Sequence, residues 1–276
     1  MGIDIVGIGL QPSMDVLDIG KNAIEVPGGN IANTLIALQS LGVKTGYMGI
    51  IGSDNYGIKI LDEFSSVGID TKRLRQENIS TPFCKIKLKD GERTLKCHGV
   101  FKVVSEFLEE DKNYLKDVDG VFSRLDYPVA KDHLEFAEEN GLTTFVTIHD
   151  TRKKFLSILD SFAPNYIFAN ENESGMIDIP SLTNKGAVVI VTMGVKGCKV
   201  YGNGIVECPA YRIDAIDTTG AGDAFAAGYI YGVLKKWDEL KKCKFANAVG
   251  ALATLHYGAR TLTSPQSVLN FIDNRK

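Results

Sequence analysis

One segment of the chain places two glycines and an acidic residue where an apolar helix is expected to begin. The segment reads DTTGAGDAFAAGY and runs from Asp217 to Tyr229. Gly220 and Gly222 lack a β-carbon, so the backbone there can approach a ligand closely and adopt positive φ values. Free N–H groups at a helix start attract anions. Asp223 would lie in the first turn beside such an anion, where a carboxylate can remove a proton from a hydroxyl group that attacks a phosphate.

Asp223 by itself also has a purely structural explanation. An Asp in the first turn of a helix commonly does no more than stabilise the helix dipole. A single glycine-x-glycine pattern is likewise a weak signal. The complete string from Asp217 to Asp223 favours the chemical interpretation over the structural one.

Strand and helix patterns alternate along most of the chain. The run of β-branched residues from Val188 to Val191 is typical of a strand buried on both faces. Repeated strand–helix units with right-handed crossovers predict an α/β fold, with a mostly parallel sheet covered by helices on both faces. Strands are expected at about 3–9, 45–52, 120–123, 143–148, 166–169 and 188–192, and helices at about 31–41, 56–67, 130–140, 153–162, 221–234 and 244–257.

Residues 83–97 follow a different pattern. Apolar residues alternate strictly with lysines from 83 to 89, the dipeptide DG at 90–91 is a strong turn signal, and a return strand follows. Such alternation indicates a sheet that is covered on one side only. We therefore expect a single chain, 1–276, with a small β-sheet lid. The lid would comprise about residues 10–26 and 80–102, and the α/β core about residues 1–9, 27–79 and 103–276.

Four motifs resemble those of one enzyme family. DTTGAGDAFAAGY resembles the C-terminal signature of the ribokinase-type (PfkB) carbohydrate kinases, and GGNIAN at 28–33 resembles their N-terminal signature. NENE at 170–173 is similar to the NxxE motif of the family, and VTMGVKG at 191–197 is similar to its VTxGxxG element. The motifs stand in the family's order and span about residues 1–260.

This resemblance implies a ribokinase-like fold and a phosphotransferase activity. Members of the family transfer the γ-phosphoryl group of ATP, with Mg²⁺, to a hydroxyl group of a sugar or a related molecule. Matched by motif, Asp223 would be the general base, and the backbone of Gly220, Ala221 and Gly222 would form the anion hole.

The same resemblance assigns expected roles to further residues. Gly28, Gly29 and Asn33 would contact the sugar hydroxyls. Glu173 would help to hold the water shell of Mg²⁺, and Asn170 would face the phosphates. The nucleotide would be bound by Thr192, Gly194 and Gly197, with Asn247 at the adenine. Some relatives bind a monovalent cation in the loop that Asp217 opens, so such an ion is a further candidate.

Two positions depart from the pattern of the family. Relatives often have an Asp five residues after the glycine of the first strand, whereas here Asp15 follows Gly9 by six. Asp15 is still the candidate for holding sugar hydroxyls, because a carboxylate can accept two bonds from a diol. After a middle strand the chain reads IHDTR. His149 or Asp150 would lie at the ligand-binding edge of the sheet, although His149 could equally serve only to end the strand.

The composition is that of an ordinary globular chain. Of 276 residues, 44% are hydrophobic and 24% are charged, which excludes a disordered polymer, a collagen and a disulfide scaffold. The net charge of −3 provides no general basic field for nucleic acid or an anionic membrane. The N-terminus lacks a signal-peptide pattern, and no apolar run reaches the about 20 residues that a membrane helix needs. We expect a cytoplasmic protein without nucleic-acid or membrane partners.

Five cysteines occur in the chain, and they show neither CxxC spacing nor a nearby pair of histidines. An odd number without a motif indicates reduced, partly buried thiols, as in a cytoplasmic protein. The five are Cys84, Cys97, Cys198, Cys208 and Cys243.

The sequence thus predicts an ATP-dependent sugar kinase, with two alternatives. A nucleoside kinase of the same fold would need an aromatic clamp, which Phe83 and Phe101 could supply. A non-catalytic sugar- or nucleotide-sensing relative would have no use for Asp223. The apolar face of the hairpin, which includes Ile86, must cover either the sugar site or the lid of a second subunit. A homodimer through the lid is therefore a further expectation.

Overall fold

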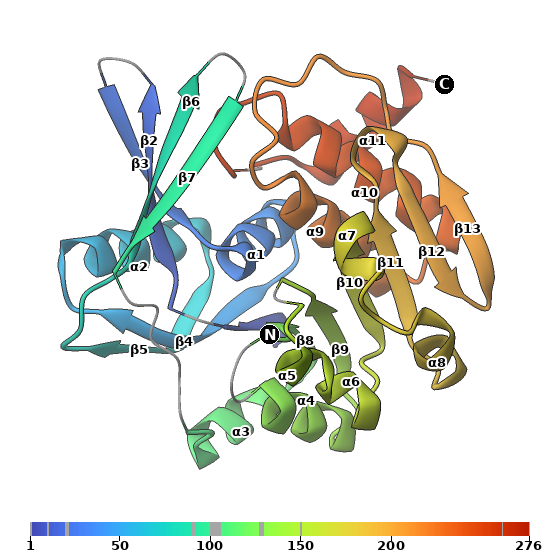
Figure 1. Ribbon diagram of the computed structural model, residues 1–276. Helices are drawn as coiled ribbons and strands as arrows, with labels where there is room; N and C mark the ends of the chain where they lie inside the picture. Colours follow the sequence, from blue (N-terminus) through green and yellow to red (C-terminus); the bar gives the residue numbers. More distant parts are fainter. Residues whose placement is uncertain are drawn as a thin grey trace.

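The computed structural model describes residues 2–9, 11–19, 22–89, 92–99, 106–126, 130–149, 151–260 and 262–275. Two sheets organise these residues (Figure 1). A nine-stranded sheet lies in the middle of the molecule, and a four-stranded sheet projects from one side of it. A large, mostly parallel sheet with helices and a separate small sheet is the predicted fold class, which is confirmed.

The large sheet changes its strand order at β1. The chain leaves β1 toward β4 and β5 on one side, and it returns to β8 on the other. Seven neighbouring strands of this sheet, β5, β4, β1, β8, β9, β10 and β11, run parallel to one another. Strand β12 is antiparallel to β11, and β13 is antiparallel to β12. Open α/β sheets bind ligands at the carboxyl ends of the strands near such a point. In spatial order the strands are β13 (Gly204–Cys208), β12 (Cys198–Gly202), β11 (Val188–Thr192), β10 (Tyr166–Asn170), β9 (Thr143–Thr147), β8 (Val118–Arg124), β1 (Ile3–Ile8), β4 (Thr45–Gly52) and β5 (Asp70–Glu77).

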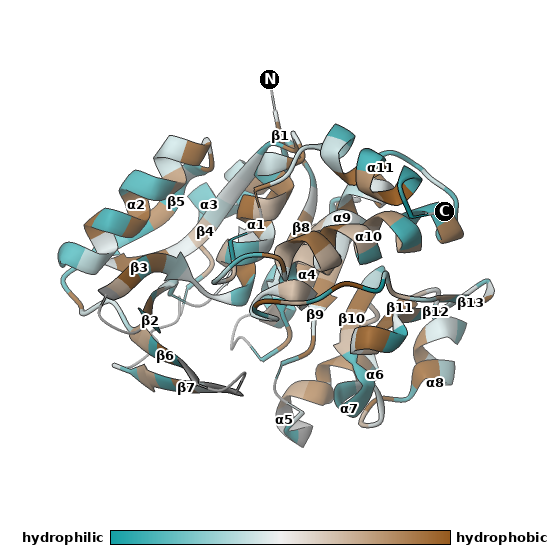
Figure 2. Ribbon diagram, turned by 90° about the horizontal axis from the view of Figure 1, so that it is seen from above, coloured by the Kyte–Doolittle hydropathy of each residue, from teal (hydrophilic) through white to brown (hydrophobic). Residues whose placement is uncertain are grey.

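Apolar side chains project from both faces of the large sheet. Successive strand residues point to opposite sides, so Phe145 packs in one core and Val146 in the other. Figure 2 shows hydrophobic central strands between helices that carry polar residues on their outer sides. One core is covered by α1 (Asn30–Ser40), α2 (Asn55–Val67), α9 (Ala221–Leu234), α10 (Glu239–Ala253) and α11 (Pro265–Asp273). The other is covered by α3 (Glu109–Leu115), α4 (Ala130–Glu139), α6 (Ile158–Ser161) and α8 (Ile179–Asn184).

The small sheet has the order β3 (Asn22–Gly28), β2 (Ser13–Ile19), β6 (Phe83–Lys89) and β7 (Glu92–His98). Cys84 and Ile86 of β6 are buried, whereas Lys85 and Lys87 are exposed, so the predicted alternation is confirmed at these residues. Asp15, Cys84 and Cys97 are register partners across β2, β6 and β7 and therefore lie on one face. The division of the chain into a core and a lid stays a prediction.

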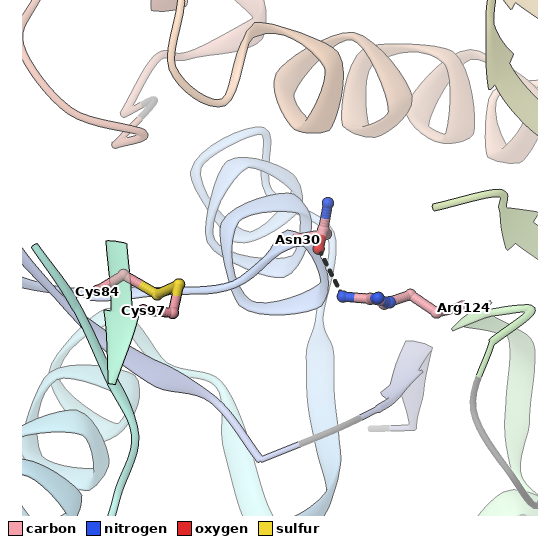
Figure 3. Close-up of a disulfide and its surroundings, with 4 residues drawn as sticks. All are labelled: Asn30, Cys84, Cys97 and Arg124. Atoms are coloured by element: carbon pink, nitrogen blue, oxygen red, sulfur yellow. Dashed lines mark hydrogen bonds between the residues drawn. A yellow bond between two sulfur atoms is a disulfide. The ribbon is translucent and has the colours of Figure 1, made fainter. Parts of the chain in front are cut away.

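A disulfide joins Cys84 to Cys97 in the small sheet (Figure 3). The prediction of reduced thiols is therefore wrong for these two residues. The reason is the register of the hairpin, which places two cysteines 13 positions apart directly opposite each other. The other three cysteines, Cys198, Cys208 and Cys243, are free and buried.

Several elements differ from their expected form. Strand β5 was not predicted because its sequence DTKRLRQE is polar, as befits an edge strand. The helix expected at 153–162 is two short helices, α5 (Lys153–Leu156) and α6. Helix α10 begins earlier than expected because the side chain of Asp238 caps it. The last helix, α11, was not predicted, although Ser264 caps it and a proline follows. Among the helices of the described ranges, none has the length and apolar character to span a bilayer.

Candidate active site

The start of α9 has the geometry that the glycine-rich segment predicts, with one difference. Gly220 is the N-cap and has a positive φ of 73°. A β-carbon there would lie 2.7 Å from the β-carbon of Ala259, so only glycine fits. Gly222, in contrast, is helical without a positive φ, so the conformational freedom of glycine is used at Gly220 and not at Gly222. A β-carbon on Gly222 would meet no protein atom within 4 Å, so the space above it is open to a ligand.

Asp223 lies in the first turn of α9 and faces the start of α1. The Nδ2 of Asn33 donates to the Oδ2 of Asp223 at 2.8 Å. Burial raises the pKa of Asp223 to about 6, and the nearby charge of Asp15 adds to this rise. Hydrogen bonds from Asn33 and Asn30 and the charge of Arg124 act in the opposite direction. The carboxyl group is therefore ionised at neutral pH and is a stronger base than an ordinary Asp.

The small sheet brings its own polar residues to the same place. Asp15 on β2 is only 8% exposed, and its carboxyl carbon lies so close to Gly28 that a β-carbon on this glycine would approach it within 2.3 Å. Gly29 has a φ of 102° and is the N-cap of α1. Asn33 follows on the same helix. The structure thus brings together all four residues that were expected to contact a sugar.

Asn33 has an unused acceptor. Its Oδ1 is buried and has no hydrogen-bond partner among the described residues. Leaving a buried polar atom unpaired costs about 1–3 kcal/mol. A ligand hydroxyl that donates to this atom would remove the cost.

A cavity of about 190 Å³ lies next to Asp223 and extends to the carboxyl ends of β9, β10 and β11. Asn170 at the end of β10 and Glu173 in α7 (Glu171–Ser174) form a capping box at this cavity, each side chain accepting from the backbone N–H of the other. Burial raises the pKa of Glu173. The polar lining consists of Asn30, Thr147, His149, Asn170, Glu173, Thr192 and Asp223.

A larger cavity of about 390 Å³ lies on the other side of the start of α9. It shares Thr192 and Gly222 with the first cavity, so the two adjoin at the backbone of Gly222. Asn247 lines it, but the Nδ2 of this residue also donates to the backbone oxygens of Cys208 and Pro209. The predicted nucleotide residues Thr192, Gly194, Gly197 and Asn247 all line this cavity, whereas Asn170 lines the smaller one.

Asp217 is buried and holds two loops together. Its Oδ1 accepts from the backbone and hydroxyl of Thr219, and its Oδ2 accepts from the N–H of Gly258. Within the described ranges, no group of three or more His, Cys, Asp or Glu side chains has the arrangement of a metal site. A monovalent cation near Asp217 stays a prediction.

The aromatic clamp that a nucleoside kinase would need is not formed by Phe83. The ring of Phe83 stacks on His98 at 4.8 Å between centroids and adjoins Tyr56. Because Cys84 shares a face with Asp15, the ring of Phe83 lies on the opposite face. Phe83 is therefore not placed to clamp a base beside Asp15. Phe101 and Asp150 lie outside the described residues.

Two arginines near the site were missed from the sequence. Arg124, at the end of β8, donates from Nη1 to the Oδ1 of Asn30 (Figure 3). Arg260 donates from Nη2 to the backbone oxygen of Pro27 and forms an ion pair with Glu63 at 2.6 Å. No local motif marks these contacts. The sequence indicates these arginines only by position, since Arg124 follows the strand expected at 120–123 and Arg260 follows the helix expected at 244–257.

The fold and the site together define a class of protein. Residues 3–266 match the family model described as pfkB family carbohydrate kinase, and the chain belongs to this family. An ATP-dependent ribose-1-phosphate kinase of Halopiger xanaduensis is 31% identical over 262 residues, which cover 90% of this chain and 87% of that protein.

Solved structures agree in fold. Ribokinase of Arabidopsis thaliana, complexed with ribose and ATP, has a TM-score of 0.85 at 18% identity, with 99% of each chain covered. Adenosine kinase of Sinorhizobium meliloti has a TM-score of 0.84 at 20% identity, with 100% of each chain covered. The fold is therefore ribokinase-like.

Proposed function

We propose that this chain is an ATP-dependent kinase that phosphorylates a hydroxyl group of a sugar or a sugar derivative. The observation that carries the proposal is the junction of the two cavities at Gly222, with Asp223 on one side of it. A nucleotide in the larger cavity would direct its terminal phosphate toward Gly222. An acceptor beside Asp15 and Asn33 would direct its hydroxyl toward Asp223 from the other side.

In the proposed reaction the carboxylate of Asp223 takes the proton of the acceptor hydroxyl. The hydroxyl oxygen forms a bond to the γ-phosphorus as the bond from that phosphorus to the β-phosphate oxygen breaks, and ADP leaves. The backbone N–H groups of Gly220, Ala221 and Gly222 at the start of α9 would stabilise the charge on the transferring group. That of Ala221 donates to the backbone oxygen of Thr218 at 3.3 Å and would have to exchange this weak bond for the phosphate.

The acceptor would be held by groups of the small sheet and α1. Asp15, which lies against Gly28, can accept from two neighbouring hydroxyls. A β-carbon on Gly29 would meet no protein atom within 4 Å, so the backbone there leaves room for a ligand. The unpartnered Oδ1 of Asn33 is an acceptor for one more hydroxyl. These three acceptor oxygens, two on Asp15 and one on Asn33, suit a polyol better than an apolar molecule.

The residues at the end of β10 fit Mg²⁺. Glu173 and Asn170 supply oxygen ligands, which Mg²⁺ prefers, and one oxygen of Glu173 is already held by the capping box. Mg²⁺ keeps several of its waters, so these side chains would hold it through its water shell. When bound, the ion would neutralise charge on the phosphates.

A coupled ADP-release assay tests the proposal. The panel should contain pentoses, hexoses, sugar acids, ribose 1-phosphate and nucleosides, because relatives include a ribose-1-phosphate kinase and the fold includes an adenosine kinase. We expect sugar-dependent ADP release for at least one sugar or sugar derivative. Release that only nucleosides stimulate would favour the nucleoside kinase, and tight sugar or nucleotide binding without turnover would favour the sensing alternative.

Further properties belong to the same proposal. We infer a cytoplasmic location, where ATP is available. A homodimer through the small sheet would cover Leu95 on β7, which is 54% exposed on the face that Ile86 shares. A monovalent cation would bind in the loop near Asp217. Leu95→Lys should shift a dimer to monomer in analytical ultracentrifugation, and replacing K⁺ by tetramethylammonium should lower the rate if the cation is required.

A further inference from the structure

Arg124 is a charged residue at the site that the proposed reaction does not use. Its side chain is only 14% exposed and extends from the end of β8 toward the first turn of α1 (Figure 3). Its Nε and Nη2 both donate to the carboxylate of Asp126, while its Nη1 donates to the Oδ1 of Asn30 at 3.1 Å. The guanidinium group is thus held between a carboxylate and an amide.

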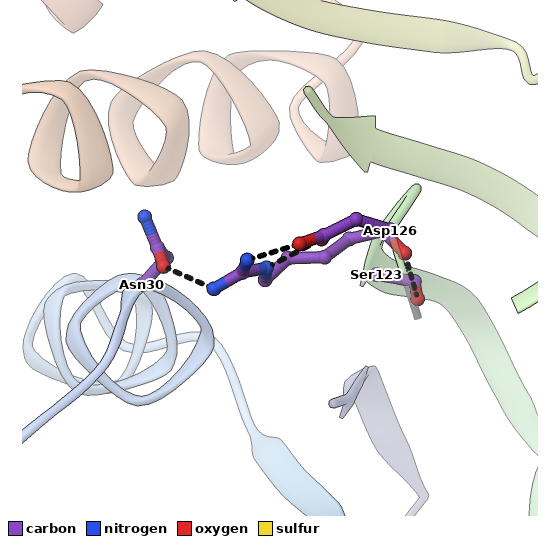
Figure 4. Close-up of polar contacts among 4 residues, drawn as sticks. Asn30, Ser123 and Asp126 are labelled. Carbon is purple, nitrogen blue, oxygen red and sulfur yellow. Dashed lines mark hydrogen bonds and ion pairs between the residues drawn. The ribbon is translucent and has the colours of Figure 1, made fainter. Parts of the chain in front are cut away.

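This contact determines which way the amide of Asn30 points. A guanidinium group has donors only, so it is the oxygen of Asn30 that faces Arg124. The amide nitrogen then points away, toward α9 (Figure 4), and Asn30 hydrogen-bonds to the carboxylate of Asp223. If Arg124 were absent, the amide could turn over and present its oxygen to a carboxylate, which has no proton to donate.

Asp223 depends on such donors because its other surroundings favour the neutral acid. Its partial burial disfavours the charged form, and two further carboxyl groups lie on elements packed around the cavity. Donors that bind the ionised form are what keep it charged. The titratable and charged side chains around Asp223 are Asp15 on β2, Arg124 with its partner Asp126 after β8, His149 after β9 and Glu173 on α7.

The two amides in the first turn of α1 differ in the state of their oxygens. Asn30 and Asn33 both donate to Asp223. The oxygen of Asn33 has no partner among the described residues, so it is available to a ligand. The oxygen of Asn30 is already bound by Arg124. Asn30 is therefore fixed by the protein alone, before any acceptor arrives.

We propose that Arg124 is a positioning residue, which acts through the amide of Asn30 to keep the carboxylate of Asp223 ionised and correctly aligned. This inference rests on the proposed role of Asp223 as the general base. Arg124 itself makes its contacts to Asn30 and Asp126 and needs no contact with the substrates. Its effect must therefore appear in the pH dependence of the transfer step.

The test measures single-turnover phosphoryl transfer between pH 5.5 and 9 for the wild type and Arg124→Met. We expect the acidic limb of the profile to move up by about one pH unit, since an opposite charge and a hydrogen bond each favour the ionised form. Such a shift lowers the rate up to about tenfold at pH 6, and the rate recovers at pH 9. Arg124→Lys keeps the positive charge but not the forked arrangement of donors. The acidic limb of its pH profile should lie between those of the wild type and Arg124→Met.

A second variant and a control separate this effect from loss of stability. Asn30→Ala leaves Arg124 in place and should produce the same shift, and adding Arg124→Met to it should change the profile little further. Arg73→Met is the matched control, because Arg73 is 17% exposed and pairs with Asp111 at the far edge of the large sheet. It should leave the shape of the pH profile unchanged.

The outcomes distinguish this inference from the proposed function. A pH-independent loss in Arg124→Met, or a shift that is equally large in the Asn30→Ala background, would overturn the role of Arg124. Asp223→Asn, measured alongside, should be slower than the wild type by about 10²–10⁴-fold at neutral pH and should not recover at pH 9. If Asp223→Asn stays active, the proposed base itself is wrong, whatever Arg124 does.

Discussion

The amide of Asn33 donates to the carboxylate of Asp223 at 2.8 Å, although 190 positions separate the two residues in the chain. One belongs to the N-terminal glycine motif and the other to the C-terminal one. The hydroxyl of Thr34 adds a second link by donating to the backbone oxygen of Asp223. The two motifs therefore meet at a single site, in which Asn33, a predicted sugar-binding residue, directly contacts Asp223, the predicted base.

Asp223→Asn tests the base. The substitution keeps the shape of the side chain and removes its ability to accept a proton, so kcat should fall by about 10²–10⁴-fold. Nucleotide affinity, measured by calorimetry, should change little, because Asp223 lines only the smaller cavity. A variant whose kcat stays within a few-fold of the wild-type value would contradict the assignment.

The same substitution should stabilise the protein at neutral pH. Burial raises the pKa of Asp223 from its usual 3.8 to about 6, so the folded state binds a proton more tightly than the unfolded state between these pH values. The stability that Asp223 contributes therefore falls as the pH rises through this window. Removing the charge should raise the free energy of unfolding by roughly 1–3 kcal/mol at pH 7.

Urea unfolding at pH 4, 5, 6 and 7 measures this effect. The difference between Asp223→Asn and wild type should shrink toward pH 4, where both proteins are neutral at this position. A difference that is the same at every pH would mean that the gain has nothing to do with ionisation.

Gly222→Val tests the anion hole. The valine side chain would project into the junction of the two cavities, and because a β-carbon there meets no protein atom within 4 Å, the fold should survive. We expect turnover to drop at least about 100-fold, as when an oxyanion donor is lost. Gly222→Ala, which adds only a methyl group, should be affected less. Wild-type turnover in a folded valine variant would show that phosphate does not approach this backbone.

Cys97→Ser tests the disulfide. Cys97 is exposed, whereas Cys84 is buried, so the substitution removes the cross-link with little change in packing. For a closed loop of this size, loss of the bond costs about 3 kcal/mol in the chain-entropy account. Hydrogen exchange in β6 and β7 should therefore be faster in the variant than in the oxidised wild type.

Reduction provides the control for this experiment. Dithiothreitol should raise the rate of hydrogen exchange in β6 and β7 of the wild type to that of Cys97→Ser. It should leave the exchange rate of the variant unchanged. If the wild type reacts with a thiol reagent at Cys97 without any added reductant, the pair is reduced in solution, and the expectation of reduced thiols would hold for it.

Local motifs explain which parts of the site could be predicted. Gly220 and Asp223 lie in one contiguous string whose spacing fixes the start of α9, so the sequence was enough. The contact between Arg124 and Asn30 joins residues 94 positions apart, and it depends on how β8 lies beside α1. The pairing of Cys84 with Cys97 depends on hairpin register in the same way. Neither of these two contacts leaves a local pattern in the sequence. Strand β5 was missed for another reason, because its polar sequence lacks the apolar run by which the neighbouring strands were predicted.

The continuity of β3 with α1 has a mechanical consequence. Strand β3 ends at Gly28, only Gly29 intervenes, and α1 then begins with Asn30 and carries Asn33 in its first turn. The edge strand of the small sheet is thus joined by one residue to the helix whose amides contact Asp223. A displacement of β3 should therefore be transmitted along the backbone to these amides, and through them to the carboxylate of Asp223 on α9.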